Sequence, residues 1–135
     1  MTQSHTIHGT FDVQLTPLTA APEEAEANLG HLLLRKQFHG ELEASGLGHM
    51  MSFRSAEPSS AGYVAMERVE GRLAGRSGSF VLMHFGEMAR GTPKLLVQVV
   101  PDSGTGELVG LSGTLGIDIR DGKHFYEFNY RLPTA

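Results

Sequence analysis

Side chains that can exchange protons gather on one face of three segments that alternate like β-strands. Successive side chains of a strand point to opposite faces, so residues of one parity lie together. In the segments 62–70, 76–86 and 123–132, one parity contains Tyr63, Glu67, Phe80, His84, His124, Tyr126 and Tyr130. If these faces line the interior of a barrel, the side chains predict a mixed apolar and polar ligand-binding site.

Glu67 and His84 are the candidate catalytic residues of this set. A carboxylate or imidazole turned inward can serve as general acid or base, because burial and neighbouring charges shift its pKa. A buried carboxylate can equally be structural, accepting hydrogen bonds and pairing with a cation. The sequence offers three such cations, Lys36, Arg72 and Arg76. Both interpretations stay open.

Neither a metal nor a nucleotide cofactor is expected. The pair His39-x-Glu41 supplies two ligands, whereas a zinc site takes three or four. The glycine-rich stretch SGTGELVGLSGTLG at 103–116 follows an apolar run, as a phosphate-binding loop would. Its glycine spacing misses the dinucleotide-binding pattern by one residue, and strand-like alternation follows in place of a helix. The glycines therefore indicate a tight turn and a coiled strand.

The elements that must position these residues are strands along the whole chain. The alternation predicts strands at 5–15, 31–44, 49–54, 62–70, 76–86, 94–100, 107–119 and 123–132, with turns between them that include Ser45-Gly46 and Asp121-Gly122. A helical turn is expected only within 22–28. Mostly short connections favour antiparallel pairing. We therefore predict an all-β chain with little helix, folded as a single eight-stranded antiparallel barrel over 1–135, with a two-sheet sandwich as the alternative.

Composition excludes several classes of partner. The formal charge is −4, and no basic block is present to bind nucleic acid. The chain has no cysteine, which fits a reducing cytoplasm. The first residues lack a charged segment followed by an apolar core, and no apolar run approaches the roughly 18 residues of a membrane span. A soluble cytoplasmic protein without nucleic-acid or membrane partners is expected.

Several motifs carry a family resemblance. Segments 99–108, 110–114 and 122–130 resemble the C-terminal motif of a bacterial family of uncharacterised proteins. The glycine pattern that starts at Glu67 and closes at His84-x-Gly86 is similar to its upstream motif. Members of that family resemble allene oxide cyclase in fold, a small eight-stranded antiparallel barrel. The resemblance implies architecture and no established activity.

Three functions fit these observations, and the sequence does not decide whether the protein is an enzyme. The leading hypothesis is a barrel that binds a small apolar or amphipathic molecule, a lipophilic ligand, in its interior. The second is an isomerase or cyclase in which Glu67 or His84 moves a proton while the barrel excludes water. The third is a non-catalytic barrel that acts through self-association as a homo-oligomer or through a protein partner.

Overall fold

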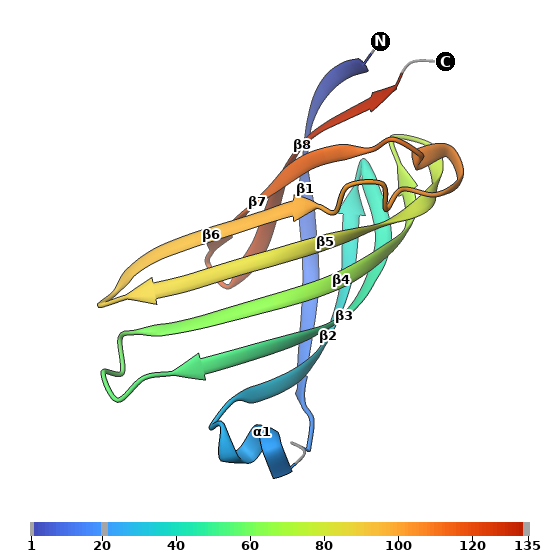
Figure 1. Ribbon diagram of the computed structural model, residues 1–135. Helices are drawn as coiled ribbons and strands as arrows, with labels where there is room; N and C mark the ends of the chain where they lie inside the picture. The colour runs from blue at the N-terminus through green and yellow to red at the C-terminus, as the bar shows by residue number, and fades with distance from the viewer. Residues whose placement is uncertain (1, 20–21, 134–135) are drawn as a thin grey trace.

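The protein is a closed antiparallel barrel of eight strands in which each strand pairs with the next and β8 pairs with β1. The computed structural model describes residues 2–19 and 22–133 (Figure 1). The strands are β1 (Thr2–Pro17), β2 (Gly30–Gly40), β3 (Leu42–Arg54), β4 (Ala61–Leu73), β5 (Arg76–Ala89), β6 (Thr92–Val99), β7 (Ser112–Arg120) and β8 (Lys123–Pro133). The only helical elements within these residues are α1 (Pro22–Glu26) and the 3₁₀ turn η1 (Gly106–Leu108). The prediction of an all-β eight-stranded barrel is confirmed.

The first reversal after α1 lies earlier than the sequence pattern predicts. A single strand over 31–44 followed by a turn at Ser45-Gly46 is wrong, because β2 ends at Gly40 and β3 runs without a break through both residues. Gly40 has a φ of 114°, a conformation open to glycine, and this permits the tight reversal. Ser45 lies mid-strand, paired in register with Gln37 on β2. Gly46 therefore lies within a strand and forms no turn.

The predicted strand 107–119 also begins too early. The connection from Val100 folds over one end of the barrel through η1, and the strand starts only at Ser112. Leu108 and Leu111, which strand parity would place on opposite faces, are both buried in the core. The backbone amide of Thr105 donates a hydrogen bond of 2.8 Å to the carbonyl of Ser79, which fixes the connection to β5. This end is named the capped end.

The opposite end, where β1 ends and β4 begins, is named the open end. The packed core fills the half of the barrel toward the capped end with large side chains that include Phe80, Phe128, Leu73 and Leu82. At the open end, three apolar side chains of inward parity remain exposed: Leu15 by 46%, Leu95 by 42% and Ile119 by 62%. Figure 1 shows α1 at this end and the 100–111 connection at the other. The core is thus packed toward the capped end, and apolar side chains of inward parity are exposed at the open end.

Strand pairing around the barrel is least extensive between β6 and β7. These strands share one register pair, Gln98 with Thr114, whereas β4 and β5 pair along their full length from Ala61 to Leu73. Within residues 2–19 and 22–133, no helix is long and apolar enough to cross a membrane.

Candidate functional site

A cluster of three ionisable side chains lies at the centre of the barrel. Glu67, midway along β4, is fully buried, and its Oε1 accepts a hydrogen bond of 3.2 Å from Lys36 Nζ on β2. The same oxygen lies 2.9 Å from His84 Nε2 on β5. Lys36 and His84 are also buried, at 7% and 5% exposure. This cluster of Lys36, Glu67 and His84 is named the central triad.

The sequence of β3 allows Lys36 to reach Glu67 on the next strand but one. Lys36 pairs in register with Gly46 of β3, which has no side chain to block the path across that strand. The ammonium also lies 4.8 Å from the ring centroid of Phe11 and 5.6 Å from that of Phe38, so aromatic faces share its stabilisation. Burial lowers the pKa of Lys36, and the Glu67 carboxylate opposes that shift.

The second oxygen of the carboxylate has no such partner. Among the residues that the structure describes, Glu67 Oε2 is the one buried side-chain oxygen or nitrogen without a hydrogen bond. It faces Gly46, where an added Cβ would overlap it and would lie 3.0 Å from Glu67 Cδ. A buried carboxylate oxygen left without a donor is costly, so this atom is the natural point for a hydrogen-bond donor.

Tyr63 stands between the central triad and the open end. Tyr63 lies two residues before Ala65 on the inward face of β4. Its ring lies over Gly86 of β5, where an added Cβ would be 2.8 Å from Cζ of Tyr63. Desolvation, and secondarily the Glu67 charge, raises the pKa of Tyr63. Small residues surround this position: Gly48, Ala65 and Gly86 are buried and face inward. The Tyr63 ring occupies the space that Gly86 leaves, and the backbone of β4 at Met66 and Glu67 lies against Gly48.

Tyr126 is inward-facing, as predicted, and its hydroxyl is engaged with the backbone. It accepts a hydrogen bond of 3.1 Å from the amide of Leu42 and lies 3.0 Å from the carbonyl of His39 as donor. Its ring packs over Gly9 of β1, the residue opposite it in register. These contacts give Tyr126 a structural role that fastens the β2–β3 reversal to β8.

The other predicted residues lie in separate regions of the interior. Phe80 stacks on Phe128 in the packed base, with ring centroids 5.8 Å apart. Tyr130 lies at the capped end, where its ring stacks on His5 at 5.1 Å. His124 lies toward the open end, with its ring 5.1 Å from that of Phe11. The structure therefore brings Tyr63, Glu67 and His84 together. Phe80, His124 and Tyr130 lie apart from them. Ligand binding by any of the seven predicted residues stays a prediction.

The sequence predicts Lys36, the third member of the central triad, only as one of three possible partners of Glu67. Its parity is the signal that could identify it, since Leu34, Lys36 and Phe38 alternate on the buried face of β2. For metal binding, residues 2–19 and 22–133 contain no group of three or more histidine, aspartate or glutamate side chains placed to hold an ion. His39 Nε2 instead contacts Asp12 Oδ2 at 2.9 Å on the barrel exterior.

Comparison with known proteins agrees with this architecture. A model of the family described as "Protein of unknown function (DUF3224)" matches residues 7–130. The chain belongs to the DUF3224 family. A crystal structure of a DUF3224 protein of unknown function from Shewanella oneidensis MR-1 is 50% identical in sequence, with a TM-score of 0.90, and the match covers 98% of this chain and 100% of that one.

For this DUF3224 member, the expectation of an uncharacterised bacterial family is confirmed. The resemblance to allene oxide cyclase stays a prediction, because these comparisons do not concern that enzyme. None of the curated proteins compared with the chain matches it.

Proposed function

We propose that this DUF3224 protein binds a small apolar or amphipathic molecule that enters at the open end and donates a hydrogen bond to Glu67 Oε2. The observation that carries the proposal is this oxygen, buried without a donor among the described residues. Exposed inward side chains at the rim, Leu15 and Leu95, offer apolar contact on the way in. The ligand class follows as a hydrocarbon with one neutral donor such as a hydroxyl, because Lys36 already balances the carboxylate charge.

A matched pair of probes tests the role of the oxygen. 1-Octanol can donate a hydrogen bond, whereas methyl heptyl ether has the same length and cannot. A hydrogen bond to a charged group contributes about 1.5–3 kcal/mol, so calorimetric titration is expected to show octanol bound at least about tenfold more tightly than the ether. In Glu67→Gln, whose amide can present a donor in place of the bare oxygen, this preference is expected to disappear.

Glu70→Gln is the control, because Glu70 is an exposed carboxylate on the outer face of the same strand. It is expected to keep the preference for octanol unchanged. Failure of the native protein to bind either probe, or an unchanged preference in Glu67→Gln, would refute the proposal.

A proton-transfer enzyme of the isomerase or cyclase type is the second candidate, and the contact of 2.9 Å between Glu67 and His84 favours it. A buried carboxylate held against an imidazole can accept a proton from a bound carbon acid and relay it. With 2-octanone as ligand in D₂O, such an enzyme would exchange the hydrogens beside the carbonyl for deuterium, and Glu67→Gln would not. Absence of exchange, together with the expected preference for 1-octanol over the ether, supports the first function over the second.

A further inference from the structure

The outer surface of β3 to β6 carries a cluster of apolar side chains around one exposed polar residue, His49, which pairs in register with Met66. The outward side chains that form the cluster are Leu47, Met51, Phe53, Val64, Met66, Met83, Phe85 and Leu96, and this set is named the apolar face. Val64 pairs in register with Met51 on one side and Phe85 on the other, and Phe85 pairs with Leu96. The side chains are therefore neighbours across four adjacent strands.

The exposure of these side chains is large for a surface that contacts only water. Met66 is 55% exposed and Val64 54%, and Leu96, Leu47, Phe53 and Phe85 lie between 44% and 48%. At roughly 200 Å² per large side chain, the six present on the order of 600 Å² of apolar surface. The largest apolar patch on a typical monomer measures about 300–600 Å² and is often functional, and a standard interface buries about 800 Å² per partner. The outward residues of β1, by contrast, are polar: Thr6, His8, Thr10, Asp12 and Gln14.

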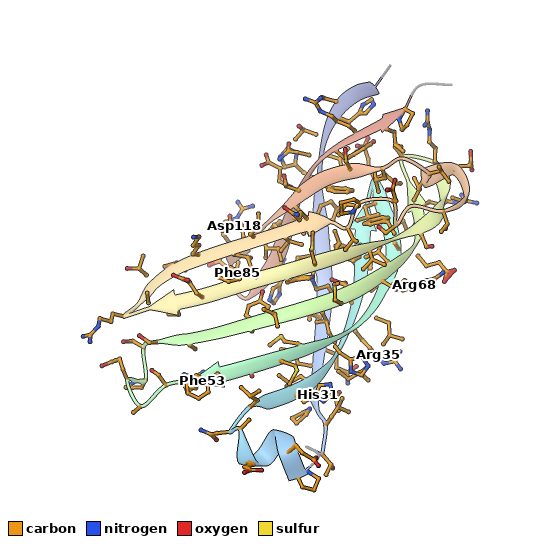
Figure 2. The ribbon with its side chains drawn as sticks, viewed as in Figure 1. His31, Arg35, Phe53, Arg68, Phe85 and Asp118 are labelled. Carbon is orange, nitrogen blue, oxygen red and sulfur yellow. The ribbon has the colours of Figure 1, made fainter. Side chains whose placement is uncertain are left out.

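Charges of opposite sign border the two ends of the apolar face. Arg68 follows Met66 on β4 toward the capped end, and Glu87 lies opposite Gly62 on β5 toward the open end. Figure 2 shows Phe53 and Phe85 nearer the open ends of their strands and Arg68 nearer the capped end. In the described part of the chain Glu87 forms no ion pair, and the Arg68 guanidinium bonds to Ser79 Oγ at 3.3 Å. Lys94, paired with Glu87 in register, has its ammonium 6.0 Å from the Phe85 ring centroid.

The relief of the surface also has two complementary parts. A shallow groove of about 550 Å³ runs over Gly62, between Phe53, Val64 and Phe85. Met66, which is 55% exposed, lies two residues beyond Val64 on the same outward face of β4. A groove and an exposed methionine at separate positions of one patch are compatible with a two-fold contact, in which the same patch of each copy meets that of the other.

We infer that the apolar face is an interface between two copies of this chain. The two-fold axis that relates them lies in the plane of the interface, over β4 between Val64 and Met66, and runs across the strands. This rotation lays the two faces together with their strand directions reversed. Met66 of each copy then lies beside the groove of the other, and Arg68 of each copy comes next to Glu87 of the other. An anionic surface or an acidic partner would match one end of the face and be repelled at the other.

Sedimentation measurements on the full chain test this interface. The native protein is expected to be a dimer at micromolar concentration, and Met66→Glu a monomer with an unchanged circular dichroism spectrum. Val109→Glu is the control, because Val109 is 64% exposed and lies outside the apolar face, and it is expected to remain dimeric. A native protein that is monomeric, or that associates with vesicles in place of itself, would overturn the inference, and so would a dimeric Met66→Glu.

Charge reversal tests the orientation of the two copies. Arg68→Glu and Glu87→Arg are each expected to raise the dimer dissociation constant about tenfold or more, because each places like charges together. The double variant restores the opposite charges in exchanged positions and is expected to dimerise as the native protein does. If each single change weakens the dimer and the combination does not restore it, the two-fold arrangement is wrong.

Discussion

Replacing Gly46 by alanine should destabilise the barrel through one atom of Glu67. An alanine Cβ at this position would overlap Glu67 Oε2 and would lie 3.0 Å from Cδ and 3.2 Å from Cγ of that side chain. The carboxylate is fully buried, so it cannot swing into solvent to make room. It must shift within the core, away from the donors on Lys36 and His84 that now bind Oε1 at 3.2 Å and 2.9 Å.

The cost of Gly46→Ala follows from these contacts. Forcing an extra methyl group into a packed interior costs about 1–3 kcal/mol. Weakening a hydrogen bond to a charged group, which contributes about 1.5–3 kcal/mol when intact, adds part of that value. We expect the free energy of unfolding to fall by about 3 kcal/mol, measured by urea denaturation followed by circular dichroism. Gly116→Ala is the matched control, because its Cβ would meet only the Glu127 carbonyl oxygen at 3.8 Å.

A double-mutant background isolates the carboxylate as the cause. In Lys36→Met/Glu67→Ala, both charges of the buried pair are gone, so no carboxylate remains for the alanine to displace. Gly46→Ala is then expected to be neutral or to stabilise the strand by up to about 1 kcal/mol, the usual gain over glycine. A penalty of the same size in both backgrounds, or one that Gly116→Ala reproduces, would refute this reasoning.

Two further predictions concern the tyrosines. Tyr126→Phe removes the acceptor of the Leu42 amide and the donor to the His39 carbonyl. It should lower the free energy of unfolding, measured by urea titration, by about 1–3 kcal/mol. An unchanged urea midpoint would show that the hydroxyl is dispensable. Burial raises the pKa of Tyr63, Tyr126 and Tyr130, so above their ordinary value of 10.0 the unfolded chain binds fewer protons and stability should fall with rising pH. The pKa of Lys36 is lowered, so below its ordinary value of 10.5 the unfolded chain binds more protons and stability should rise with rising pH. Lys36→Met should remove this rise. Urea midpoints across alkaline pH that coincide for the native protein and this variant would contradict the assignment.

The fold could be predicted because alternation and turn chemistry are local properties. The Asp121-Gly122 dipeptide predicted a hairpin, and the structure has this turn between β7 and β8, with φ of 51° and 76° at the two residues. The reversal at Gly40 was missed because Ser45-Gly46 has an equally good turn composition. The glycine at position 46 instead leaves space for the carboxylate of Glu67, a contact between strands that the local pattern does not relate.

Parity predicted which residues of the candidate site face inward but not their position along the barrel. Glu67 and His84 are adjacent because β4 and β5 pair with Ala65 opposite His84, a register that depends on the turn at Ala74 and Gly75. Tyr130 shares the inward face but lies at the capped end beside His5. Depth within a barrel follows from strand stagger, which is a property of the closed sheet as a whole.

Closure between β1 and β8 also determines when the fold can be completed during synthesis. Thr6 Oγ1 on β1 donates a hydrogen bond of 2.6 Å to Asn129 Oδ1 on β8, 123 positions later. A chain emerging from the ribosome therefore holds β1 with one edge unpaired until almost all of its partner strand has been made. Unpaired strand edges recruit other chains, and contacts between distant residues form slowly. The nascent protein thus exposes an unpaired edge of β1 until β8 appears, and a pause in translation ahead of β8 would prolong that interval.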